Sequence, residues 1–268
     1  MTALVFDKYE GLGNDFIVVE VDAGSAIDSS QALRLCDRHF GVGADGVLLV
    51  MPPTSAEARA RMVVLNADGS RPEMCGNGLR CVALHLARRD SSVGTSYVVD
   101  TDAGPLLCEV ERDGGTAQVK VGMGRGRVEG EHVTRFDGAK VSFSRISMGN
   151  PHAIVFDSGF DEAAIDRLGS QVSSELPGGS NVEFAVAHGD GAFDLVVWER
   201  GVGRTLACGT GAAATAVAAA LSGRAAYDEP LSLCLPGGAL EISVAPGTLA
   251  VTLRGPARYV FAGEVPAP

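Results

Sequence analysis

Two segments of this chain are near copies of each other and lie almost half a chain length apart. Residues 74–80 read MCGNGLR, and residues 207–213 read ACGTGAA. Strand-like apolar runs at 62–66 and 195–199 keep the same offset of about 133 residues. A repeat of this period predicts a duplicated domain, because the units of a solenoid are much shorter. The chain is therefore expected to fold as two similar halves.

Each copy combines a predicted helix with a predicted hairpin. About a dozen residues without Gly or Pro follow each Cys-Gly-x-Gly, which predicts a helix, and the second of these, 212–221, is apolar nearly all round, as is typical of a buried helix. Alternating apolar residues then flank a turn at 106–121 and at 240–253, which predicts hairpins. We expect an α+β fold of two pseudo-symmetric duplicated domains, each a mostly antiparallel sheet or barrel wrapped around a central helix.

The boundary between the two predicted domains falls in a glycine-rich and polar region. Gly122-Met123-Gly124 and the polar stretch 125–138 predict a linker. The first domain is expected to span 1–123 and the second 124–261. A pocket in the cleft between them is the expected place for a small-molecule site, because such sites are common at domain interfaces.

Charge and composition exclude several classes of function. A net charge of −11 argues against a nucleic-acid partner, which requires a basic surface. Residues 1–7 have neither a basic region nor a long apolar stretch, and no window reaches about 18 uninterrupted apolar residues, so we expect a cytoplasmic protein with no signal peptide and no membrane span. None of the six cysteines forms Cys-x-x-Cys, so no metal site is predicted.

The two duplicated cysteines point to proton transfer. A thiol at a helix N-terminus lies near the positive end of the helix dipole, which lowers its pKa. The free N–H groups of the same helical turn can bind a carboxylate, and the flanking glycines allow its close approach. A thiol and a thiolate on opposite faces of one carbon can invert it, one sulfur removing the α-proton and the other delivering a proton. Cys75 and Cys208 are therefore the candidate acid–base pair.

Motifs along nearly the whole chain resemble those of the diaminopimelate epimerases. Proline and hydroxyproline racemases usually carry His after the first Cys-Gly, whereas this chain has Asn77. The matching segments are Gly11–Phe16, Asn66–Ser70, Met74–Cys81, Met148–His152, Asn181-Val182, Glu199–Gly201 and Ala207–Gly211.

The resemblance implies a cofactor-independent epimerisation of LL-2,6-diaminopimelate to meso-diaminopimelate, which supplies lysine and peptidoglycan precursors. It implies that no cofactor is bound, that diaminopimelate is the small-molecule partner, and that residues 262–268 return to complete the first domain. It also allows for a homodimer.

The resemblance assigns a role to each matching residue. Cys75 and Cys208 would be catalytic, and His152 and Glu199 would assist the thiols. One departure from the family pattern is Gly46, where some members carry a Gln that makes a polar contact. The substrate-binding residues implied are Asn14, Asn66, Gly76, Asn77, Asn150, Asn181, Glu199, Arg200, Gly209 and Thr210.

Other interpretations remain open for these residues and for the chain. Without the resemblance, turn roles would be favoured for Asn14, Asn150 and Asn181, because each neighbours turn-forming residues. His152 alone could be a buried core histidine, and Glu199-Arg200 a surface pair. The chain as a whole could be another cofactor-independent amino-acid racemase on the same scaffold, or a non-enzymatic metal-binding or redox protein.

Overall fold

The computed structural model describes residues 3–22, 27–156, 159–188 and 191–266. Two compact units make up the chain. Unit 1 contains Met1–Val121 and Gly255–Pro268, and unit 2 contains Gly122–Arg254. Of the segment 262–268, expected to complete the first domain, residues 267–268 lie outside the described part.

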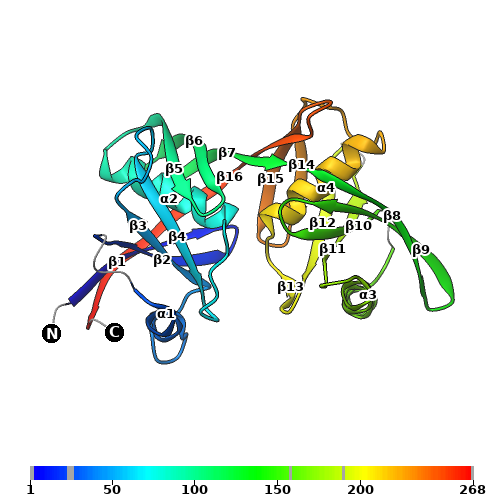
Figure 1. Ribbon diagram of the computed structural model, residues 1–268, viewed down its shortest axis with the longest axis horizontal. Coiled ribbons are helices and arrows are strands. Elements are labelled where there is room, and N and C mark those ends of the chain that lie inside the picture. The colour runs from blue at the N-terminus through cyan, green and yellow to red at the C-terminus, as the bar shows by residue number, and fades with distance from the viewer. Residues whose placement is uncertain (1–2, 23–26, 157–158, 189–190, 267–268) are drawn as a thin grey trace. The chain divides into compact units, whose positions relative to one another are not determined.

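Unit 1 is a ring of strands around a helix (Figure 1). Its strand order is β1-β2-β3-β4-β5-β6-β7-β16, and β16 also pairs with β1, which closes the ring. Helix α2 (Gly76–Arg89) is buried from its first residue to Ala87 and contacts β1 through β6. The strands are β1 (Ala3–Gly11), β2 (Asn14–Glu20), β3 (Gly46–Met51), β4 (Ala60–Asn66), β5 (Gly94–Thr101), β6 (Gly104–Asp113), β7 (Thr116–Arg125) and β16 (Ala250–Pro266).

Unit 2 also arranges its strands around a helix, but no pairing among its described strands closes them into a ring. Its strand order is β16-β15-β14-β12-β11-β10-β9-β8, with β13 paired to β12. Helix α4 (Gly209–Leu221) is buried on nearly all sides and contacts β9, β10, β11 and β15. The other elements are β8 (Arg127–Phe136), β9 (Ala139–Ser147), β10 (Pro151–Phe156), β11 (Asn181–Ala187), β12 (Phe193–Glu199), β13 (Gly203–Thr205), β14 (Leu231–Leu235) and β15 (Gly238–Val244).

The helices and hairpins predicted from the repeat are confirmed, and two further helices were missed. Helix α1 (Ser29–Cys36) joins the parallel strands β2 and β3, and α3 (Glu162–Glu175) joins the parallel strands β10 and β11. Parallel neighbours need a crossover connection, so each parallel pair requires a helix or long loop. A local signal for α1 exists, because Asp28 and Gln31 form a capping box at its start.

The predicted linker over 122–138 is wrong, because residues 122–125 belong to strand β7. Residues 127–136 form strand β8, which pairs with β9 in an antiparallel register. β8 comes last in the strand order of unit 2, and most of its side chains are exposed. A strand at the end of a sheet can be polar on both faces, which makes its sequence resemble a loop.

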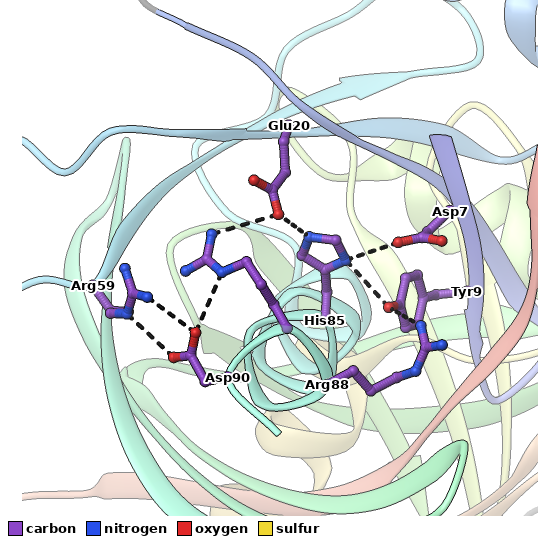
Figure 2. A network of polar contacts seen from close by, with 8 residues as sticks. Asp7, Tyr9, Glu20, Arg59, His85, Arg88 and Asp90 are labelled. Carbon is purple, nitrogen blue, oxygen red and sulfur yellow. Dashed lines mark hydrogen bonds and ion pairs between the residues drawn. The ribbon is translucent and has the colours of Figure 1, made fainter. Parts of the chain in front are cut away.

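A polar network holds the C-terminal end of α2 against the strands of unit 1 (Figure 2). His85 lies at its centre, with Nε2 2.8 Å from Glu20 Oε1 and Nδ1 3.2 Å from the hydroxyl of Tyr9. Arg88 donates to the same hydroxyl and its guanidinium lies 3.4 Å from the centroid of the Tyr259 ring. These contacts fix the axis of α2, and with it the position of the helix N-terminus.

A buried carboxylate near the end of β5 gives a testable pH dependence. Burial alone would raise the pKa of Asp100, but hydrogen bonds from the hydroxyl and backbone N–H groups of Ser55 and Thr54 outweigh it and lower the pKa to about 2. Because the unfolded value is about 3.9, this carboxylate stabilises the fold above about pH 4 and the stabilisation is lost as the pH falls toward about 2.

We expect Asp100→Asn to lower the free energy of unfolding at pH 7 by about 1–2 kcal/mol, because an amide accepts these bonds more weakly than a carboxylate. Between pH 4 and pH 2 the variant should lose less stability than the wild type. Urea unfolding at several pH values measures both effects. Equal slopes for the two proteins below pH 4 would contradict the assignment, and the exposed Asp113→Asn serves as the control.

Candidate active site

Cys75 and Cys208 occupy the same local structure in the two units. Each is the N-cap of its buried helix, with φ and ψ of −137° and 109° at Cys75 and −131° and 107° at Cys208. Each sulfur lies 3.4 Å from a backbone nitrogen that donates to it, from Gly78 in one unit and from Gly211 in the other. A helix N-terminus that donates to sulfur stabilises a thiolate more than a thiol.

The glycines of these first turns let the helices approach the strands beneath them. A Cβ on Gly78 would lie 2.9 Å from a methyl carbon of Leu48 on β3. A Cβ on Gly211 would lie 2.6 Å from Oε1 of Glu183 on β11. The Cys-Gly-x-Gly pattern therefore has a packing role in addition to leaving first-turn N–H groups, such as those of Gly76 and Gly209, without an intrahelical partner.

In unit 1 the structure brings Asn14 and Asn77 together beside Cys75. Asn77 Nδ2 donates to Asn14 Oδ1 over 3.2 Å, and Asn14 Nδ2 donates to Asp45 Oδ2 over 2.7 Å. On the other side, Arg80 donates to Asn77 Oδ1 over 3.0 Å. A chain of bonds from Asp45 to Arg80 thus orients both amides.

Asn66 lies at the end of β4, in a turn. Its Nδ2 donates to the hydroxyl of Ser70 over 2.9 Å, and its backbone pairs opposite Gly46. A Cβ on Gly46 would lie 2.9 Å from the carbonyl oxygen of Leu65. The backbone here leaves no room for the Gln that some family members carry unless β4 shifts.

In unit 2 three predicted residues form one chain that leads to Cys208. His152 Nε2 lies 3.0 Å from Asn150 Oδ1, and Asn150 Nδ2 donates to Thr210 Oγ1 over 3.3 Å. The Thr210 hydroxyl in turn lies 3.5 Å from the sulfur of Cys208. His152 itself is buried, and its Nδ1 lies 2.7 Å from Glu183 Oε1.

Asn181, Glu199 and Arg200 are held by other contacts. Arg200 donates its backbone N–H to Asn181 Oδ1 over 3.0 Å, and its exposed guanidinium donates to the carbonyl of Gly178. Glu199 accepts from the hydroxyl of Thr205 over 2.7 Å. No ion pair joins Glu199 to Arg200 within the described ranges, so the alternative of a mutual surface pair is not supported.

The pKa values of Cys208 and Glu199 in unit 2 are both raised. Burial raises the pKa of the Cys208 thiol, and the nearby carboxylates of Glu199 and Glu183 raise it further. Burial also raises the pKa of Glu199, against the bond from Thr205. Among the other cysteines, burial raises the pKa of Cys36 to about 11 and that of Cys108 to about 12, which keeps them as neutral thiols.

Three polar residues near the cysteines were not predicted from the sequence. They are Asp45, Arg80 and Glu183. Glu183 had a local signal, because it is a lone carboxylate inside the apolar run Val182–Val186. Such a side chain in a buried strand needs a partner. The partner itself could not be found from the sequence, because it lies on another strand.

The sequence matches a known family over most of its length. The profile of the family described as diaminopimelate epimerase matches residues 6–128 and 144–260. A curated diaminopimelate epimerase from Desulforudis audaxviator is 43% identical over 276 residues, which cover 97% of this chain and 98% of the relative. The chain belongs to the diaminopimelate epimerase family. The members of this family are isomerases.

Solved structures of more distant proteins share the fold of this family member. A Bacillus anthracis phenazine biosynthesis protein of the PhzF family superposes with a TM-score of 0.78 at 17% identity, covering 99% of this chain and 100% of that one. A hydroxyproline epimerase from Agrobacterium vitis superposes with a TM-score of 0.76 at 15% identity, covering 98% and 92%. At these identities the likeness concerns the fold alone: a mixed α/β architecture, rich in strands, with a barrel-like sheet.

Two features are absent from the described part of this diaminopimelate epimerase family member. No group of three or more His, Cys, Asp or Glu side chains there is arranged to hold a metal ion. None of its helices there has the length and apolar character needed to cross a bilayer.

Proposed function

We propose that this protein interconverts LL- and meso-2,6-diaminopimelate with Cys75 and Cys208 as a two-base pair. The observation that carries the proposal is the duplication of one arrangement, a cysteine N-cap whose sulfur accepts a hydrogen bond from the helix, at the only two Cys-Gly-x-Gly motifs of the sequence. The substrate is assigned from the membership of the chain in the diaminopimelate epimerase family. The reaction then requires one sulfur on each face of the α-carbon.

Each turnover would move one proton to sulfur and one proton from sulfur. The thiolate takes the α-proton, and the electron pair of the broken C–H bond spreads into the α-carboxylate. The thiol of the other cysteine then delivers its proton to the opposite face, so the charge of the enzyme is unchanged. First-turn N–H groups at Gly76, Asn77, Gly209 and Thr210 would hold the carboxylate, because developing negative charge is stabilised by donors already in place.

The remaining predicted residues would bind the groups that do not react. Asn amides suit a substrate with two ammonium and two carboxylate groups, because one amide both donates and accepts. The exposed guanidinium of Arg200 suits a bidentate contact with the distal carboxylate. His152 and Glu199 would tune the thiols. The other amides proposed here are Asn14, Asn66, Asn150 and Asn181.

Incubation of the purified protein with LL-diaminopimelate in deuterated water tests the proposal. We expect meso product that carries one deuterium at the inverted α-carbon. Product without label, or no product from this substrate together with racemisation of proline or hydroxyproline, would instead point to another activity on the same scaffold.

A homodimer and a cytoplasmic location stay predictions of the family resemblance and the sequence. Light scattering coupled to size exclusion tests the first. The exposed Val5, Val260 and Phe261 on β1 and β16 are apolar side chains that a subunit contact could cover. A mass equal to that of one chain at micromolar concentration would count against the dimer.

A further inference from the structure

The two cysteines share their backbone arrangement but differ in the charges buried around them. In unit 1 the buried charge is the guanidinium of Arg80, whose exposed fraction is 0%. It lies in the second turn of α2 and donates to Asn77 Oδ1, to the carbonyl of Gly76 and to the carbonyl of Pro256. All three acceptors are neutral. Within the described residues, no carboxylate forms an ion pair with this guanidinium.

Three ionisable groups interact electrostatically with Arg80, and two of them are unsuited to balance its charge. Glu10 already binds Arg258 over 2.9 Å and the backbone N–H of Gly13 over 3.0 Å. Burial raises the pKa of the Cys81 thiol, which keeps it neutral. The third group is Cys75. Because a guanidinium stays protonated in proteins, its uncompensated charge favours a negative charge on the Cys75 sulfur.

In unit 2 the buried charge near the equivalent cysteine, Cys208, is negative instead of positive. The position that corresponds to Arg80 in the repeat is Ala213, which carries no charge. The position that corresponds to Leu48 is Glu183, since Leu48 pairs with Val18 in β2 and Glu183 pairs with Ile154 in β10. One of these strands therefore places a leucine beneath its helix, and the other places a carboxylate there.

Glu183 is buried and only half satisfied. Its Oε1 lies 2.7 Å from His152 Nδ1, whereas Oε2 is buried without a hydrogen-bond partner in the described ranges. The groups that face Cys208 are the carboxylates of Glu183 and Glu199, together with the donors Thr210 Oγ1 and the backbone N–H of Gly211. His152 faces both carboxylates. The two carboxylates oppose a negative charge on the Cys208 sulfur.

We propose that Arg80 and Glu183 are positioning residues of opposite charge that decide where the one proton of the cysteine pair rests, with Cys75 as the thiolate and Cys208 as the thiol. This inference rests on the proposed two-base function. In the resting form Cys75 takes the α-proton and Cys208 delivers one. The form left after that turnover carries its proton on Cys75, and it returns to rest when Cys75 loses a proton to water and Cys208 gains one, or by a reverse turnover.

Alkylation of the substrate-free protein tests the inference without measuring activity. Iodoacetamide reacts with thiolates, and peptide mass spectrometry gives the rate at each cysteine from pH 5 to pH 10. In the wild type we expect the reactivity of Cys75 to rise at a pH at least one unit below that of Cys208. Midpoints of alkylation are compared, not absolute rates, because Cys208 is the more buried of the two cysteines.

The variants separate charge from packing. Arg80→Met should move the Cys75 midpoint upward by about one unit or more, a tenfold loss of thiolate near neutral pH, whereas Arg80→Lys should restore most of the shift. Arg112→Met is the matched control, because Arg112 also donates to backbone carbonyls, those of Ser92 and Gly114. Glu183→Gln should lower the midpoint of Cys208 and leave that of Cys75 in place, with Glu241→Gln as its control on the exposed face of β15.

Each outcome supports or overturns the inference. Coincident midpoints, an earlier midpoint for Cys208, or an Arg80→Met protein that keeps its circular dichroism spectrum and the wild-type Cys75 profile would overturn it. If Arg80→Lys shifts the Cys75 midpoint as far as Arg80→Met does, the charge of Arg80 is not the cause, and the inference is overturned in favour of a packing role. If the protein introduces no deuterium into diaminopimelate but the alkylation midpoints of Cys75 and Cys208 are separated, the proposed function is contradicted. If the protein epimerises diaminopimelate normally but the two midpoints coincide, only this inference is contradicted.

Discussion

Cys75→Ala and Cys208→Ala are each expected to epimerise diaminopimelate about 10³-fold more slowly than the wild type or worse. General acid–base catalysis by one positioned group contributes about 10²–10⁴-fold, and inversion needs a group on both faces. A single remaining thiol can remove a proton and return one only on its own face. Any residual exchange with deuterated water should therefore proceed with retention of configuration.

Chiral chromatography and mass spectrometry of the recovered substrate separate inversion from exchange. Cys234→Ala is the control, because this half-buried cysteine lies on β14 outside both helix caps. Wild-type rates of inversion in either variant would remove that cysteine from the mechanism. Deuterium in an inverted product of Cys75→Ala would show that a group other than Cys75 serves its face.

Gly169→Ala is expected to lower the free energy of unfolding by about 1–3 kcal/mol, the usual cost of overpacking. In an exposed helix interior the same change would stabilise by about 1 kcal/mol, because alanine has the higher helix propensity. Here the new Cβ would lie 2.6 Å from Cγ and 2.8 Å from Cβ of Trp198. A ring attached to a β-strand has little freedom to move away, so the clash outweighs the propensity.

Trp198 is the single tryptophan of the chain, so its fluorescence reports directly on this contact. Urea unfolding followed by fluorescence and by circular dichroism gives the stability change. Ser170→Ala, the next and exposed position of α3, is the matched control. A Gly169→Ala protein as stable as that control would mean that α3 lies further from β12 than described.

The local structure at the cysteines could be predicted because it is encoded within a few residues. The sequences that begin at Cys75 and Cys208 predict three local features. The cysteine is the N-cap, the glycines let the helix approach its neighbours closely, and the helix that follows is uninterrupted. The duplication strengthened each assignment by offering the same pattern twice. The hairpins β6–β7 and β15–β16 were accessible for the same reason, since alternation and turn residues are local signals.

The features that were missed depend on distant partners. The environment of Glu183 is formed by His152 on another strand and Gly211 on a helix. No local sequence pattern connects these three residues. Arg80 looks in the sequence like an ordinary charged helix residue, yet it is fully buried. The sequence of β8 resembles a linker because most of its side chains are exposed and polar. Tertiary contacts, not propensity, decide all three cases.

The closure of the unit 1 ring by β16 sets the order in which this protein can mature during synthesis. Residues 255–266 lie between β1 and β7, and Tyr259 donates its N–H to the carbonyl of Gly115 over 2.7 Å. A nascent chain released only as far as β15 still exposes two unpaired strand edges in its first half. Such edges invite association with other chains. The first half can therefore close its ring of strands only after the ribosome has delivered nearly the last strand.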